Sequence, residues 1–156
     1  MLELPSDVSL VGYEKLQELL AAGKWKEANE ETRIVMLKIA GLIKQGYFQL
    51  KDIEQFPSQD LYTIDQLWVT SSNGQFGFSV QRNIWQNVKE DWHKFGIRIK
   101  WAEDENKYQV FEWISKDNLI FSLKAPQGHL PAVFTITQST GFSAKLVWSV
   151  LSRQDF

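Results

Sequence analysis

The chain has 156 residues, which is enough for one ordinary domain with its own hydrophobic core. Apolar residues make up 44% of the sequence and charged residues 23%, the balance of a folded protein rather than a disordered one. The formal net charge of −2 provides no basic surplus for nucleic acid, and the absence of cysteine excludes disulfides, thiolate metal sites and cysteine nucleophiles. No apolar run approaches the roughly 20 residues of a transmembrane helix, and the N-terminus resembles neither a signal peptide nor a transit peptide. We therefore expect a protein without a transmembrane segment that remains where it is made, with peripheral membrane contact left open.

Apolar residues at helical spacing predict two consecutive helices near the N-terminus. Leu16, Leu19 and Leu20 mark the first helix, and Gly23 is placed to end it. The second helix carries an apolar face that runs from residue 25 to residue 39. Because the connection between them is short, we expect the two helices to pack as an antiparallel hairpin.

The segment from residue 42 to residue 56 breaks this pattern, since it is too aromatic for a solvated loop and too irregular for a long helix. Pro57 and Ser58 then predict the start of a third helix, with Ser58 as its N-cap. Asn73 and Gly74 provide a left-handed stop for that helix. A fourth helix is expected to begin near Ser79, which we also expect to act as a cap.

After residue 91 the apolar spacing changes from a helical to an alternating pattern. Ile97, Ile99 and Trp101 alternate with charged residues, which predicts a short half-buried strand. The later elements are expected to be a turn at 104–107, extended segments at 108–113 and 119–123, an ordered loop at 126–131 and a short helix at 144–151. The sequence therefore predicts a single domain over residues 1–156 that is mostly α with a minor β element.

No arrangement of polar residues matches a known catalytic or metal-binding pattern. His93 and His129 have no evident metal-ligating partner; His93 is expected to be solvated or to cap a helix, and His129 to form a turn hydrogen bond. The stretch GFSVQ at 77–81 departs from the G-x-S-x-G nucleophile pattern at Gln81 and has no apolar strand before it. The acidic run at 103–105 fits a solvated turn better than a metal site. We therefore expect neither a catalytic site nor a protein-ligated metal, and a regulator or carrier rather than an enzyme.

Aromatic residues are unusually frequent, at 13% of the chain, with 7 Trp and 10 Phe. A small core absorbs many such side chains, so ordinary packing explains them as well as any binding role does. The alternative is a cleft for a large flat ligand, because aromatic rings offer broad and rigid apolar surfaces. Composition alone leaves both explanations open.

Five stretches of the sequence, in this order and spacing, carry a resemblance to a known family. They are GKWKEA at 23–28 with ET at 31–32, FP at 56–57 with DL at 60–61, TIDQLW at 63–68, SNGQFGFSVQ at 72–81 and APQGHLP at 125–131. Together they resemble the core domain of the genomes-uncoupled (genomes uncoupled four) tetrapyrrole-binding family, over residues 13–131. Many bacterial members carry an extra helical domain before this core, and here the core starts almost at Met1, so we expect that domain to be missing.

The resemblance implies a compact, mostly helical fold shaped like a cupped hand, with an apolar palm as the ligand cleft. In that family the palm binds protoporphyrin and its magnesium derivative, and the protein regulates magnesium chelatase of chlorophyll biosynthesis through the large porphyrin-binding subunit. This implies a non-catalytic protein of a photosynthetic organism, in the cytoplasm of a cyanobacterium-like cell or in the stroma if plastid-encoded. Linear bilins are also associated with the family, so a bilin chromoprotein or pigment carrier is one alternative. A ligand-free protein-interaction module, with its aromatic residues covered by a partner, is another.

The resemblance also places the palm on the aromatic segments whose periodicity is broken. The predicted wall residues are Ile43, Tyr47, Phe48, Leu50 and Ile53 on one side, Phe111, Trp113 and Phe121 facing them, and Phe134 near the edge. For each of these side chains, packing in the core is the alternative.

One loop departs from the family pattern. In the family, the loop after the Gly-His-Leu-Pro signature carries arginines that pair with the propionates of the tetrapyrrole. Here the loop at 132–143 contains neither Arg nor Lys. Lys145 is the first cation after it, and Lys44, Arg98 and Lys124 are the other candidates for binding ligand carboxylates. We therefore expect binding to depend mainly on apolar walls and to be nearly insensitive to salt.

Overall fold

The computed structural model describes residues 12–105, 110–137 and 141–156, with only the backbone described within 104–112 and 135–142. The helices are α1 (Glu14–Ala21), α2 (Trp25–Ile39), α3 (Leu50–Glu54), α4 (Ser58–Ser71), α5 (Phe78–Asn87), α6 (Trp92–Arg98) and α7 (Ala144–Leu151). The shorter elements are β1 (Ala102–Glu105), β2 (Val110–Trp113), the 3-10 turn η1 (Lys116–Asn118), β3 (Thr135–Thr137) and β4 (Gly141–Phe142). The predicted fold class, mostly α with a minor β element, is confirmed.

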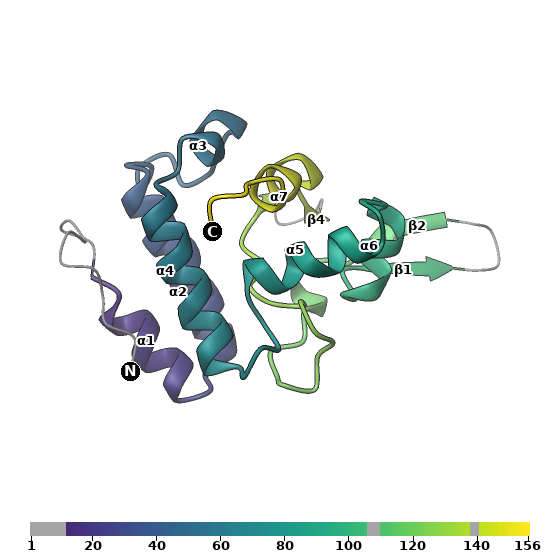
Figure 1. The fold of residues 1–156 in the computed structure, drawn as a ribbon, viewed down its shortest axis with the longest axis horizontal. Coiled ribbons are helices and arrows are strands. Elements are labelled where there is room, and N and C mark those ends of the chain that lie inside the picture. Colours follow the sequence, from purple (N-terminus) through teal and green to yellow (C-terminus); the bar gives the residue numbers. More distant parts are fainter. Residues whose placement is uncertain (1–11, 106–109, 138–140) are drawn as a thin grey trace.

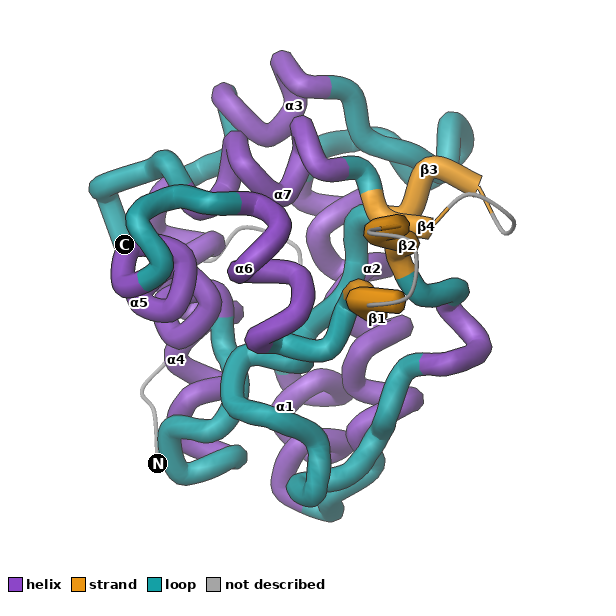
Figure 2. Tube along the Cα trace, turned by 90° about the vertical axis from the view of Figure 1, so that its right-hand side faces the viewer, coloured by secondary structure: helices purple, strands orange, loops and turns teal. Residues whose placement is uncertain are grey.

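The helices pack around one shared core (Figure 1). Helix α1 packs against both α2 and α4, and α5 leads from the end of α4 toward α6 and the β1–β2 hairpin. Helix α7 packs against α3 and α5. The two hairpins, β1–β2 and β3–β4, lie on the side of the molecule opposite α4 and α5 (Figure 2). Among the described residues, no helix has the length and apolar character needed to cross a membrane.

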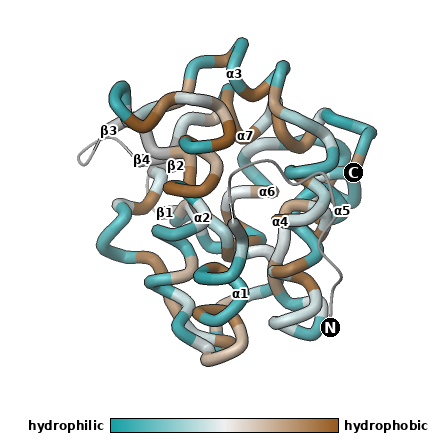
Figure 3. Tube along the Cα trace, turned by 90° about the vertical axis from the view of Figure 1, so that its left-hand side faces the viewer, coloured by the Kyte–Doolittle hydropathy of each residue, from teal (hydrophilic) through white to brown (hydrophobic). Residues whose placement is uncertain are grey.

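The N-terminal helices form as the apolar spacing predicts. Leu16 and Leu20 are fully buried on one face of α1, and hydrophobic and hydrophilic positions alternate along these helices (Figure 3). The ring of Trp25 packs against Trp68 at 6.1 Å between ring centroids, and the Trp68 Nε1 donates a hydrogen bond of 2.9 Å to the Thr32 hydroxyl. This buried contact joins α2 to α4, so these tryptophans belong to the scaffold.

Both predicted serine caps are wrong. Helix α4 begins at Ser58 itself, and the Ser58 hydroxyl donates to the Asp155 carboxylate instead of capping the helix. Helix α5 begins one residue before Ser79, whose backbone N–H donates to Oδ1 of Asp65 on α4 at 2.8 Å. The start of α5 lies against α4. A buried carboxylate of α4 therefore accepts the hydrogen bond from the free N–H group that a local N-cap side chain would otherwise accept.

The strand predicted around Ile97, Ile99 and Trp101 is also wrong, because α6 includes Ile97 and ends at Arg98, and residues 99–101 form the turn that follows it. The Asp91 carboxylate caps the helix by accepting from the Lys94 N–H at 3.0 Å. Phe95 and Ile99, four residues apart, are fully buried, which is the spacing of a helix rather than a strand. The alternation of charged and apolar residues is therefore compatible with one buried face of a helix and does not indicate a strand.

The remaining expectations are met in part. Strand β1 pairs antiparallel with β2, with Ala102 opposite Trp113, whereas the predicted turn at 104–107 lies partly in β1 and partly outside the described residues. Residues 119–123 form an irregular loop instead of a strand, since the Ile120 N–H donates to the His129 side chain rather than to a neighbouring strand. Helix α7 has the predicted bounds.

Candidate ligand-binding site

Four of the exposed apolar side chains come from the segment that leads into α3 and from α7, which packs against α3. Among the described residues, the large apolar side chains with the greatest exposure are Ile43, Tyr47, Leu50, Tyr62, Ile97, Leu123 and Trp148. Ile43, Tyr47 and Leu50 come from the segment at 41–50, and Trp148 comes from α7, against which α3 packs. An apolar surface of this kind commonly marks a binding site. We call the segment at 41–50 together with α7 the apolar face.

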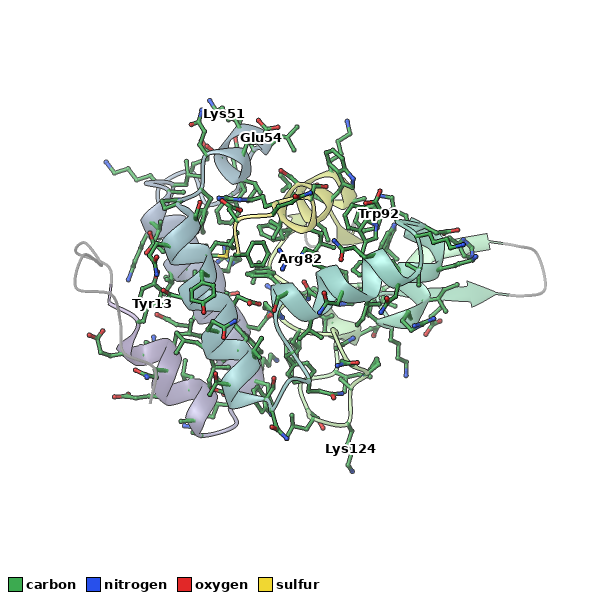
Figure 4. The ribbon with its side chains drawn as sticks, in the orientation of Figure 1. Tyr13, Lys51, Glu54, Arg82, Trp92 and Lys124 are labelled. Carbon is green, nitrogen blue, oxygen red and sulfur yellow. The ribbon has the colours of Figure 1, made fainter. Side chains whose placement is uncertain are left out.

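A pocket of 220 Å³ borders α7 and α6. Its lining residues are Trp92, Ala144, Lys145 and Trp148. The Trp92 ring, on α6 (Figure 4), also packs edge-on against Trp113 at 6.1 Å between centroids. The predicted wall residue Trp113 is therefore joined to the apolar face through Trp92. Neither Trp92 nor Trp148 is distinguished by the sequence, because both occupy ordinary helical positions and only the exposure of Trp148 sets it apart.

Three predicted wall residues are buried instead of exposed. Phe48, Ile53 and Phe134 are buried, with at most 8% of their area exposed. The Phe48 ring packs edge-on against Phe134 at 5.6 Å between centroids, and Phe134 in turn packs against Phe78 at 6.2 Å. All three side chains therefore belong to the hydrophobic core in this structure.

Phe121 lies in a different pocket, of 490 Å³, between α2 and the loop after β2. The other lining residues of that pocket are Lys26, Asn29, Glu30, Lys116, Asp117 and Leu119. Glu30 forms ion pairs there with Arg33 at 2.6 Å and with Lys116 at 3.7 Å, and hydrogen bonding to Arg33 holds the Glu30 pKa below its usual range. Phe121 is thus separated from the predicted opposite wall, and the Phe111 side chain lies outside the described residues.

The candidate cations divide between two ends of the molecule. Lys145 lines the same pocket as Trp148, and Lys44 is exposed within the segment at 41–50. Arg98 lines a shallow pocket of 660 Å³ together with Lys124. Figure 4 shows Lys124 at the end of the molecule opposite α3. The structure therefore brings Lys145 and Lys44 to the apolar face but does not bring Arg98 there.

His129 acts as a buried clamp between two loops. Its Nδ1 lies 2.7 Å from the Ile99 carbonyl, and its Nε2 accepts from the Ile120 N–H at 2.9 Å. This pattern requires the neutral ring with the proton on Nδ1. Burial lowers the His129 pKa, which also favours the neutral form. The His129 carbonyl also accepts from the Trp101 Nε1 at 2.8 Å. Both ring nitrogens are thus engaged, so His129 holds the fold together.

No metal site is evident in the part of the chain that the structure describes. No group of three His, Cys, Asp or Glu side chains lies close enough there to hold an ion. His93 lies on the exposed side of α6 near its first turn. The apolar face therefore offers aromatic and aliphatic surface with two nearby lysines, which suits a flat apolar ligand with an anionic edge.

Known proteins are similar to this chain in sequence and in fold. The model of the GUN4-like family matches residues 7–147. The tetrapyrrole-binding protein of Arabidopsis thaliana chloroplasts is 33% identical over 131 residues, which cover 76% of this chain and 47% of that protein. The ycf53 protein of Pyropia yezoensis is 38% identical over 78% of this chain and 50% of its own length, and the Ycf53-like protein of Synechocystis sp. is 36% identical over 78% and 51%. The chain thus spans about half the length of these relatives.

Solved structures agree with this assignment. The ligand-free structure of Arabidopsis thaliana GUN4 superposes with a TM-score of 0.76 at 30% identity and covers 97% of this chain and 98% of that one. The structure of GUN4 from Chlamydomonas reinhardtii superposes with a TM-score of 0.78 at 31% identity, covering 99% and 96%. The predicted family resemblance is confirmed, and this chain belongs to the GUN4-like family.

Proposed function

We propose that this chain binds a tetrapyrrole at the apolar face and catalyses no reaction on it, with protoporphyrin and magnesium porphyrin as its ligands. The observation that carries the proposal is the exposure of Ile43, Tyr47, Leu50 and Trp148 on adjoining elements in a member of this family. A relative of 33% identity is named a tetrapyrrole-binding protein. A flat macrocycle is broad enough to contact several of these exposed side chains at once.

The ligand would lie with one face on the apolar surface and its propionates toward solvent. Lys145, beside Trp148, and Lys44, beside Ile43, are the cations that could meet those carboxylates. Exposed charge pairs of this kind contribute only about 0–1 kcal/mol each. Each large apolar side chain that the ligand covers contributes on the order of 1 kcal/mol or more. Apolar contact therefore supplies most of the affinity in this proposal.

A metal at the centre of the ring would receive no ligand from His129 in this proposal. Ligation would require His129 to give up its bond to the Ile99 carbonyl or its bond from the Ile120 N–H, and both are buried. If His93, on the exposed side of α6, also gives no ligand, metal-free and magnesium porphyrins should bind with similar affinity.

The partner in this proposal is the large porphyrin-binding subunit of magnesium chelatase, which the chain would regulate. The compartment would be the cytoplasm of a cyanobacterium-like cell or a plastid stroma, as the similarity to the Synechocystis sp. and ycf53 proteins supports. A linear bilin is the second candidate ligand, favoured by the absence of Arg and Lys from the loop at 132–143. A bilin carrier would then act apart from the chelatase.

Titration with four ligands tests the proposal. Protoporphyrin, magnesium protoporphyrin, haem and biliverdin are each added to the purified chain, while tryptophan quenching and ligand absorbance are followed. We expect low-micromolar or tighter binding of a porphyrin, about −8 kcal/mol. If none of the four binds at tens of micromolar, by order of magnitude, the proposal fails and a protein-interaction module becomes the better explanation. Adding the chain to a magnesium chelatase assay then tests the regulatory role separately.

A further inference from the structure

Arg153, shortly after α7, connects the C-terminal segment to the junction of α3 and α4. Its Nη1 donates to the backbone carbonyls of Ile53 at 3.0 Å and of Phe56 at 2.6 Å. Its Nη2 donates to the Ser58 hydroxyl at 3.2 Å, and its Nε and Nη2 donate to the two Asp155 carboxylate oxygens at 2.9 and 2.5 Å. Only 13% of the Arg153 side chain is exposed. We call this set of contacts the Arg153 latch.

The latch acts on the C-terminal end of α3. The last carbonyls of a helix have no partner within the helix and carry partial negative charge, so a guanidinium there is favourable. Helix α3 has five residues, too few to be stable without tertiary contacts. At the N-terminal end of α3, the Asp52 carboxylate accepts from the Gln49 N–H at 2.7 Å. Ile53 is the buried side chain of this helix. Arg153 therefore supplies the charge-assisted contact that holds the end of α3 leading into α4.

Asp155 holds the Arg153 guanidinium, and Arg82 holds the Arg153 backbone. Hydrogen bonding to Arg153 holds the Asp155 pKa below its usual range, so this carboxylate stays charged beside it. On α5, Arg82 donates to the Arg153 carbonyl at 3.1 Å and stacks on the Phe156 ring at 4.5 Å. A lysine could not reproduce the latch. An ammonium has three N–H donors, too few for two carbonyls and both oxygens of the carboxylate.

The latch spans the two sides of the apolar face. Helix α3 and the residues before it carry Tyr47 and Leu50, whereas α7 carries Trp148. Helix α3 packs against α7, and Arg153 follows the last residue of α7 by two positions. Resting on the proposed function, we infer that Arg153 is a positioning residue, which holds the α3 side of the ligand site against the α7 side without touching the ligand. The family model matches only to residue 147, so Arg153 and Asp155 lie beyond that match, whereas their partners Ile53, Phe56 and Ser58 lie within it.

Two measurements on the full chain test this inference, with Arg153→Ala and Arg153→Lys as variants. Tyr13→Phe serves as the control, because it removes a tertiary hydrogen bond of 2.6 Å, from the Tyr13 hydroxyl to Asp60 on α4, that does not involve Arg153. The first measurement is amide hydrogen exchange at 50–56 without ligand. The second is the dissociation rate of protoporphyrin, measured by stopped-flow at a temperature where all variants are folded.

In Arg153→Ala we expect faster exchange at 50–56, unchanged exchange in α2, and dissociation of protoporphyrin about tenfold faster. Arg153→Lys should change the exchange rate and the dissociation rate nearly as much as Arg153→Ala does. Tyr13→Phe should leave both rates as in the parent chain. Unchanged exchange at 50–56 would overturn the latch, and changed exchange with an unchanged dissociation rate would overturn its role in positioning the site. If the parent chain binds no protoporphyrin, the proposed function fails and the positioning role falls with it, while the exchange measurement still decides whether Arg153 holds α3.

Discussion

Replacing Trp148 by alanine should weaken ligand binding and leave folding nearly unchanged. Trp148 lies on α7 with 47% of its area exposed, so its removal opens no cavity in the core. A tryptophan side chain offers up to about 250 Å², and the exposed part is therefore on the order of 100 Å². Covering that area at about 25 cal/mol per Å² contributes up to about 3 kcal/mol. We expect Trp148→Ala to raise the Kd for protoporphyrin by about 5–150-fold, which corresponds to about 1–3 kcal/mol.

The assay is titration calorimetry or ligand absorbance, because Trp148 is itself a fluorophore and its loss would alter a quenching signal. Tyr62→Ala is the matched control, since Tyr62 is 45% exposed but lies on α4. Phe48→Ala is the opposite case: Phe48 is buried against Phe134, and its loss should lower the free energy of unfolding by about 3–5 kcal/mol. An unchanged Kd in Trp148→Ala, or an equal loss in Tyr62→Ala, would refute the placement of the ligand on α7.

Three further substitutions test other parts of the structure. Lys145→Ala should weaken porphyrin binding by no more than about 1 kcal/mol and remove what little salt dependence there is; a larger loss would mean that Lys145 replaces the missing arginines. The His129 pKa is lowered by burial, so the unfolded chain binds the proton more readily and stability should fall as the pH drops below roughly 6.5. His129→Gln should be less stable in urea at neutral pH by about 1–3 kcal/mol and should show a flatter pH dependence; an unchanged pH profile would contradict the clamp. Gly77→Ala should lower the Tm, because Gly77 has φ 137° and an added Cβ would lie 2.7 Å from Val69 Cγ2; a Tm equal to that of the parent chain would contradict this.

The helices at the two ends of the chain were predictable because their signals are local. Apolar residues at spacings of three and four residues specify α1, α2 and α7, and Asn73 with Gly74, both at positive φ, ends α4 as expected. Family membership was predictable for a related reason: the five motif stretches combine turn residues and core residues in a fixed order. These features need no knowledge of what packs against them.

The start of α5 and the identity of α6 depend on distant partners. Asp65 on α4 provides the acceptor at the start of α5, a contact between residues 14 positions apart that no local pattern indicates. In α6, the alternation around Ile97 resembles a strand, but burial of Phe95 and Ile99 on one face makes the helix the better packed state. Propensity and spacing are weak preferences, and packing overrides them when the two disagree.

The sequence by itself determined the family, the fold class and the expectation that aromatic residues serve a flat ligand. Only the tertiary structure decided which aromatic side chains are available to one, because exposure is a property of the packed chain and not of residue type. Phe48 and Trp148 are both large apolar residues in apolar segments, yet one is buried against Phe134 and the other is half exposed on α7. The contacts of Arg153 with α3 likewise exist only once residues about 100 positions apart are brought together by folding.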